Sequence, residues 1–302
     1  MANTAKASKS SPKLLVSVSG GGALGIGPLQ FMKRLEADLG VRLGDIGEAF
    51  AGTSTGSIIA GALCKGLSAD KIYNLYREKL PKIFTKKSGL RIKDYAKYDN
   101  EGLKDTLYEI FGKSKMNKFK KPIYIPATFM NGESVEKVWD RGDSWMDQAY
   151  AIMSSCSAPT YFDVLEIQQN KKTCYYCDGG LWANDPVMVL EAGIKNLEDF
   201  DNVKILSFNT GMATPNKEPK SYTAVGWLNY ILDNWIARTG NSNLYEARAN
   251  LGADNVLRLE PRVDKSYSMD DLKKLDKVSD IWDKYYDEVK ESTLEFVRST
   301  MK

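Results

Sequence analysis

The sequence predicts an α/β domain built on parallel strands, and three observations predict it. An apolar run, Lys13–Val18, enters a glycine-rich loop at Ser19–Gly25, and a helical pattern follows over Pro28–Leu39. A second apolar run ends at Ala51 and leads through a GxSxG pentapeptide into another helical pattern. A further run of buried-strand type, Val203–Phe208, follows a helical segment later in the chain. Strands that alternate with helices in this way form parallel sheets.

Composition is that of an ordinary globular domain. The 302 residues are 43% hydrophobic and 27% charged, and the formal net charge of +3 is too small to predict a nucleic-acid partner. No run approaches the ~20 apolar residues of a membrane span, and residues 1–12 lack the apolar core of a signal peptide. We therefore expect a disordered start over 1–12, one domain over 13–302, and a cytoplasmic location.

The sequence contains no histidine. This excludes a Ser-His-Asp triad and an HExxH zinc site. Cys174 and Cys177 form a lone CxxC without a second pair or a histidine to complete a zinc site, so packing within a strand is the favoured role. No metal and no cofactor is expected, and any serine nucleophile must use a carboxylate or a lysine as its base.

Helices are predicted through the next part of the chain. The run that follows the pentapeptide predicts a helix from about Gly56 to Lys65. Ser68 is a plausible N-cap for a helix through Arg77, and Asn100 for another through Leu107, because serine and asparagine side chains accept hydrogen bonds from free helix amides. A loop is expected at 85–90.

A basic stretch at 113–121 contains Met116 and Phe119 among its lysines. It could lie on an anionic membrane surface, but a solvated connection is favoured.

The remaining elements follow from periodicity and turn residues. Strands are expected at Pro122–Phe129 and Val135–Trp139, a helix at Gln148–Met153, and a strand pair at Tyr161–Ile167 and Thr173–Cys177. A helix should begin at Asp185-Pro186, with the proline in the first helical position. The part after residue 210 is mainly helical, apart from a strand at Val256–Leu259, and ends in an amphipathic helix over Asp270–Val297.

The GxSxG pentapeptide is Gly52-Thr53-Ser54-Thr55-Gly56. Between a strand and a helix such a sequence suits a nucleophile elbow, in which small neighbours allow a sharp turn that exposes the serine at a helix N-terminus. Ser54 is therefore the candidate nucleophile. The alternative is that Thr53 or Ser54 only caps the helix.

The glycine loop formally satisfies GxGxxG through Gly20, Gly22 and Gly25. A dinucleotide site would also need an acidic residue at the end of the second strand, where this chain has the elbow. A Walker loop would need Lys and Ser or Thr after the last glycine, where this chain has Ile26-Gly27. The remaining interpretation is a run of backbone amides for an anion, such as a developing oxyanion.

Asp178 is the candidate base. It comes directly after the predicted strand Thr173–Cys177. Gly179 and Gly180 follow it and allow close approach of substrate and backbone. The alternatives are an ordinary Asp-Gly turn and a Ser-Lys pair, although no motif places a lysine beside the elbow.

These motifs together resemble the patatin-like phospholipase family. The resemblance rests on GGGALG in the glycine loop, GTSTG at the elbow, SSCSAPTYF, and DGGLWANDP, and it covers about residues 13–210. It implies a three-layer α/β/α fold with a mainly parallel central sheet, and a Ser-Asp dyad in place of a triad. Residues 211–302 match no motif.

The resemblance also implies the site residues. Ser54 would be the acyl-accepting nucleophile and Asp178 the base. The oxyanion hole would lie at Gly20, Gly21 and Gly22 together with Thr55, and the amides of Gly21, Gly22 and Thr55 would be the donors. The glycines that complete the motifs are Gly25, Gly52, Gly56, Gly179 and Gly180.

The implied substrate is a phospholipid acyl ester, reached by peripheral contact with a membrane surface. One departure is Leu24, because the family's loop usually has a basic residue there. An esterase or acyltransferase on smaller acyl groups would use the same residues, and a nucleotide-binding module or a silent scaffold are the more distant alternatives.

Overall fold

The computed structural model describes residues 11–87, 96–132, 135–195, 197–198, 200–213, 218, 221–231, 240–263 and 267–301. The expected disordered start at 1–12 falls almost entirely outside these residues, and the loop expected at 85–90 falls partly outside them.

The strands and helices have the following bounds. The strands are β1 (Lys13–Val18), β2 (Gly47–Gly52), β3 (Ile123–Phe129), β4 (Glu136–Trp139), β5 (Leu165–Gln169), β6 (Lys172–Asp178), β7 (Val203–Phe208), β8 (Met212–Ala213), β9 (Val256–Leu259) and β10 (Arg262–Val263). The helices are α1 (Ile26–Leu39), α2 (Leu43–Ile46), α3 (Thr55–Cys64), α4 (Ala69–Ile83), α5 (Asn100–Phe111), α6 (Gln148–Cys156), α7 (Gly180–Ala183), α8 (Val187–Ile194), α9 (Ala224–Tyr230), α10 (Gly240–Leu251) and α11 (Leu275–Arg298).

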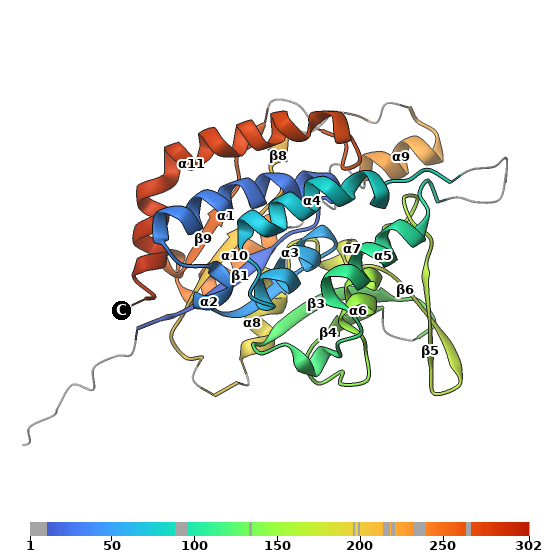
Figure 1. The fold of residues 1–302 in the computed structure, drawn as a ribbon, viewed down its shortest axis with the longest axis horizontal. Coiled ribbons are helices and arrows are strands. Elements are labelled where there is room, and N and C mark those ends of the chain that lie inside the picture. Colours follow the sequence, from blue (N-terminus) through green and yellow to red (C-terminus); the bar gives the residue numbers. More distant parts are fainter. Residues whose placement is uncertain are drawn as a thin grey trace, which may run out of the picture.

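A mixed sheet forms the centre of the molecule (Figure 1). Its strand order is β5-β6-β3-β2-β1-β7-β9, and β4 pairs with β3 off this path. The pairs β2–β3, β1–β2, β1–β7 and β7–β9 are parallel. The pairs β3–β4, β3–β6 and β5–β6 are antiparallel. The prediction of a mainly parallel sheet is confirmed, with an antiparallel extension at one side.

Helices cover both faces of this sheet. Along β1, Leu14, Val16 and Val18 pack into a core with α1, α3, α4 and α11, whereas Leu15 packs into a second core with α8 and α10. Successive side chains of a strand point to opposite faces, so a strand buried on both sides is apolar throughout. In Figure 1, α11, α1 and α4 lie side by side over one face. The three-layer α/β/α architecture is confirmed.

The predicted helix starts at Ser68 and Gln148 are confirmed, whereas others differ from the structure by one or two residues. Ser68 caps α4, where its hydroxyl accepts a hydrogen bond from Lys71 N at 3.3 Å. The cap of α5 is Asp99 instead of Asn100, because the Asp99 carboxylate accepts from Glu101 N at 2.8 Å. Pro186 is the N-cap of α8, which begins at Val187.

Tertiary contacts shortened two predicted elements. The strand expected from Tyr161 begins only at Leu165, because the amides of Tyr161 and Phe162 turn back to the carbonyl of Ala158. The last helix begins at Leu275 after a short 3-10 turn. Its predicted packing face is confirmed for Trp282, which is buried.

The basic stretch at 113–121 is a packed connection. Met116 and Phe119 are buried in the main core. Lys121 Nζ donates to backbone carbonyls of the α2 segment, and Lys115 pairs with Asp147 at 2.7 Å. Because its apolar side chains are already buried, this stretch offers no apolar contact to a membrane. The interpretation as a connection is supported.

The four cysteines are buried and unpaired, including Cys174 and Cys177 on β6. Within the ranges that the structure describes, no helix combines the length and apolar character needed to cross a bilayer.

Strand register brings the chain segments of interest to one edge of the sheet. The parallel strands β1 and β2 end together, with Val18 opposite Gly52. Asp178 lies at the end of β6, which reaches this edge as a strand that runs antiparallel to β3. Ala51 is opposite Tyr124 in β3, and Asp178 is opposite Ala127 of the same strand, beyond the end of β2. The extension of β3 therefore carries Asp178 level with the turn after β2.

Candidate active site

Ser54 occupies a sharp turn between β2 and α3. Its backbone has φ 53° and ψ −126°, a conformation with positive φ that a non-glycine residue adopts only when its surroundings enforce it. The Ser54 amide donates to Ser155 Oγ at 2.9 Å, and the Ser54 carbonyl accepts from Ser57 Oγ at 2.6 Å. Strain at a turn that exposes a hydroxyl is the geometry of a nucleophile elbow.

The elbow glycines permit close backbone contacts. Gly56 lies against the end of β1, where a Cβ would come within 2.1 Å of the Val18 carbonyl oxygen. A Cβ on Gly52, the last residue of β2, would likewise lie 2.1 Å from the Gly56 carbonyl oxygen. A side chain at either position would open the turn.

The simpler role of a helix cap does not account for the elbow hydroxyls. The Ser54 side chain makes no capping hydrogen bond to α3. Thr53 Oγ1 instead donates to the Ala183 carbonyl at 2.6 Å, which ties the elbow to the segment that follows Asp178.

Asp178 lies beside Ser54, and the Ser54 side chain lowers the pKa of its carboxyl group. The carboxylate is 5% exposed and accepts a hydrogen bond from the Gly180 amide at 2.6 Å. Burial is the larger effect and raises the pKa of Asp178 to about 6, while Ser54 and the Gly180 amide oppose it. The carboxylate is thus ionised at neutral pH and is more basic than an exposed aspartate. Gly179 precedes α7 as its N-cap.

Residues at the end of α6 hold both members of this pair. Ser155 Oγ accepts from the Ser54 amide, and the Ser157 carbonyl accepts from the Asp178 amide at 3.0 Å. The SSCS sequence was singled out only by resemblance, and the role of Ser155 was not predicted. The serine-rich run Ser154–Ser157 before the Ala158-Pro159 pair is the local signal for it.

The glycine loop lies directly against the elbow. A Cβ on Gly20 would lie 3.1 Å from Ser54 Cβ and 2.5 Å from Asn184 Oδ1. The Gly20 amide donates to the Asn184 carbonyl at 3.0 Å, and its carbonyl accepts from Thr210 Oγ1 at 3.0 Å. Gly20 therefore anchors the loop, and its amide is not available to an oxyanion.

Three other predicted amides remain available. Among the residues that the structure describes, no hydrogen-bond acceptor faces the backbone N–H of Gly21, Gly22 or Thr55. Thr55 is the first residue of α3, where amides have no partner within the helix. Free donors next to a serine hydroxyl can stabilise a negatively charged oxygen. These are the three amides that the resemblance implies as donors, and their role in stabilising an oxyanion stays a prediction.

Position 24 holds a leucine where the family's loop usually has a basic residue. Leu24 is half-buried and packs against the main core. Within the described ranges, no hydrogen bond or ion pair joins a lysine to Ser54 or Asp178, so the structure gives no support to a Ser-Lys pair. In the same ranges, no group of three or more acidic or cysteine side chains is arranged to hold a metal ion.

Comparison with known proteins is consistent with this geometry. Residues 16–191 match the family described as patatin-like phospholipase. The cUMP-AMP-activated phospholipase of Escherichia coli is 27% identical over 233 residues, which are 74% of this chain and 70% of the relative. Patatin-like protein 2 of Arabidopsis thaliana is 24% identical over 289 residues, which are 80% of this chain and 70% of the relative.

Among solved structures, VipD from Legionella pneumophila aligns with 91% of this chain and 67% of its own, at 13% identity and a TM-score of 0.40. The family match spans more than half of the chain and contains the glycine loop, the elbow and the DGG segment. The chain belongs to the patatin-like phospholipase family.

Proposed function

We propose that this chain hydrolyses fatty-acyl esters of phospholipids through a Ser54–Asp178 dyad. Membership of the family supports a lipid-hydrolysing enzyme. The observation that carries the finer proposal is the position of the Asp178 carboxyl group beside the Ser54 side chain, next to the free amides of Gly21, Gly22 and Thr55. A nucleophile, a base and oxyanion donors are the parts that acyl transfer requires.

In the first half of the reaction, Ser54 Oγ attacks the acyl carbonyl carbon while Asp178 accepts the hydroxyl proton. The carbonyl oxygen becomes an oxyanion and receives hydrogen bonds from the free amides. Each such donor contributes on the order of 3–4 kcal/mol in comparable enzymes. Collapse of this intermediate breaks the ester C–O bond, and Asp178 returns the proton to the departing alcohol of the lysophospholipid.

In the second half, water attacks the acyl-Ser54 ester. Asp178 takes a proton from the water, a second oxyanion forms in the same place, and its collapse breaks the bond to Ser54 Oγ. The proton passes to Ser54, and a fatty acid leaves. The same carboxylate therefore acts as base and acid in turn, for which a pKa near the working pH is suited.

An exposed apolar residue three positions after Asp178 supports a lipid substrate. Leu181 follows Gly180 at the start of α7, and its side chain is 40% exposed. We propose that this part of the surface meets the lipid and gives peripheral contact with a membrane, without nucleic acid as a partner. A smaller, soluble ester would need no such contact.

The test is acyl release by purified protein. Wild type and Ser54→Ala are compared on phosphatidylcholine and phosphatidylglycerol vesicles and on p-nitrophenyl butyrate, with free fatty acid measured by mass spectrometry. Wild type should release fatty acid from vesicles, and Ser54→Ala should lose at least about 10³-fold of that activity. Ser292→Ala is the matched control, since Ser292 is exposed in the C-terminal part of α11.

Activity of Ser54→Ala equal to wild type would refute the dyad. Turnover of the butyrate ester alone would favour the esterase alternative. Because one relative is named for activation by cUMP-AMP, each assay is run with and without that cyclic dinucleotide.

A further inference from the structure

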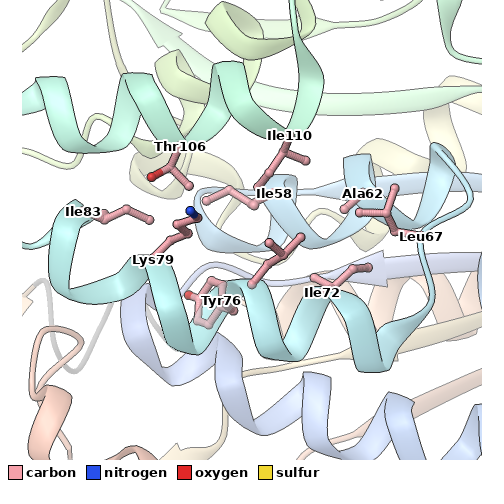
Figure 2. Close-up of a pocket in the computed structure, with 10 residues that line it drawn as sticks. Ile58, Ala62, Leu67, Ile72, Tyr76, Lys79, Ile83, Thr106 and Ile110 are labelled. Carbon is pink, nitrogen blue, oxygen red and sulfur yellow. The ribbon is translucent and has the colours of Figure 1, made fainter.

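A buried hydroxyl on α4 joins the two segments that carry the free amides. Tyr76 is 5% exposed, and its ring lines a small pocket between α3, α4 and α5, with Ile58 and Ile110 among the neighbours (Figure 2). Its hydroxyl leaves this apolar setting and contacts the Gly22 carbonyl and Thr55 Oγ1. Gly22 belongs to the glycine loop, and Thr55 to the elbow.

The direction of these hydrogen bonds follows from the donors available. A phenol has one hydrogen, and the Gly22 carbonyl can only accept, so Tyr76 donates to Gly22. Thr55 Oγ1 then donates to the phenol oxygen. Burial raises the pKa of Tyr76 well above its ordinary value, so the phenol keeps its proton at all relevant pH.

The contact fixes one peptide unit of the loop from both sides. Tyr76 holds the carbonyl of the Gly22–Ala23 peptide, and the amide of the same peptide donates to the Met269 carbonyl at 2.7 Å. A peptide unit is planar, so holding both ends fixes its orientation. The free amide of Gly22 directly precedes this unit, and that of Gly21 lies one residue earlier in the same loop.

Gly25 leaves space for the hydroxyl groups of Tyr76 and Thr55. A Cβ at this position would lie 2.8 Å from Thr55 Oγ1 and 3.0 Å from the Tyr76 hydroxyl. The last glycine of the GxGxxG pattern is thus explained by this contact, without a bound nucleotide.

We propose that Tyr76 is a positioning residue, which holds the glycine loop and the elbow so that their free amides meet the same oxyanion. This inference rests on the proposed acyl hydrolysis. Misplacement of an oxyanion donor by a fraction of an ångström lowers the rate of the chemical step and leaves binding of the acyl chain unchanged. The hydroxyl of Tyr76 should therefore affect kcat and not KM.

The test compares Tyr76→Phe with Tyr73→Phe. Tyr73 lies one turn earlier on α4 and is 9% exposed, and its hydroxyl contacts Ser279 at 3.2 Å and Arg77 at 3.1 Å instead of the loop. Kinetics on p-nitrophenyl butyrate, per active site titrated with a fluorophosphonate, should show kcat lowered about 10- to 100-fold in Tyr76→Phe, with KM within about threefold. Tyr73→Phe should stay within about twofold of wild type.

A second pair of variants guards against a folding defect. Thr55→Val removes the hydroxyl that contacts Tyr76 and should lower kcat. Thr55→Ser keeps a hydroxyl at this position and should have the kcat of wild type. Equal kcat in Tyr76→Phe and wild type, or an equal loss in Tyr73→Phe, would overturn the inference while the dyad stands. Absence of Ser54-dependent turnover in wild type would overturn both.

Discussion

Two buried aspartates, seven positions apart, have opposite surroundings. Asp178 is 5% exposed and has a serine hydroxyl and a backbone amide as partners. Asp185 is 1% exposed and pairs with the Arg258 guanidinium at 2.6 Å. Burial raises the pKa of both carboxyl groups, but only at Asp185 does a cation oppose the effect.

The difference separates a reactive carboxylate from a structural one. A counter-ion would hold Asp178 as a weak base, whereas its absence leaves a carboxylate able to accept a serine proton. Arg258 itself is buried and also contacts Ser207 Oγ at 2.8 Å on β7. Asp185 therefore links the start of α8 to β7 and β9, while Asp178 remains available for chemistry.

The largest effect is expected at Asp178. Asp178→Asn removes the proton acceptor and should lower kcat/KM for ester hydrolysis by about 10³- to 10⁴-fold, as measured with the vesicle assay. Because the change also removes an unpaired buried charge, urea denaturation should show no loss of stability. Retained activity in this variant would show that Asp178 is not the base, so that it would not differ in role from Asp185.

The next effect concerns stability. Arg258→Met leaves Asp185 buried without its counter-ion and should lower the free energy of unfolding by about 3–5 kcal/mol, measured by urea denaturation. Arg258→Lys keeps the charge and serves as the control, with a smaller loss. A change below about 1 kcal/mol in Arg258→Met would show that the pair has no structural role.

The smallest effect is the pH dependence. The base must be ionised, so kcat/KM should rise about tenfold per pH unit below a midpoint near the Asp178 pKa of about 6, and level off above it. The contribution of Asp178 to folding stability changes with pH in the opposite direction from the rate. Because the pKa of Asp178 is raised in the folded protein, its contribution favours folding at low pH and is lost as pH rises from about 4 to about 6.

The rate profile is measured on the soluble ester from pH 4.5 to 9, with Tyr73→Phe as a variant expected to leave the midpoint unchanged. A profile that is flat between pH 5 and 8 would contradict the assignment of Asp178 as the base.

Local sequence patterns were sufficient where a short segment determines its own geometry. The bounds of β1 and β7 were predicted exactly as the structure has them, since a strand covered on both faces is apolar throughout. The elbow at Ser54 follows from glycines that permit close contact with β1. The absence of histidine already restricted the base to a carboxylate or a lysine.

Contacts between remote segments decided the rest. The sequence placed Asp178 at a strand end, but only the register of antiparallel β6 against the extended β3 brings it level with Ser54. The sequence also placed Gly20 in the oxyanion-hole loop, but only the structure shows that its amide donates to the Asn184 carbonyl.

Tyr76 lies outside every motif that predicted the site, and Ser155 lies in the SSCSAPTYF segment but was given no role there. The partners of both residues are distant in the chain. Which donors stay free, and which hydroxyls hold them, depends on how the helices pack across the sheet. The sequence by itself determined the α/β order, the candidate nucleophile and the candidate base. Only the tertiary structure determined their relative positions, because hydrogen bonds between distant segments leave no periodic or local pattern.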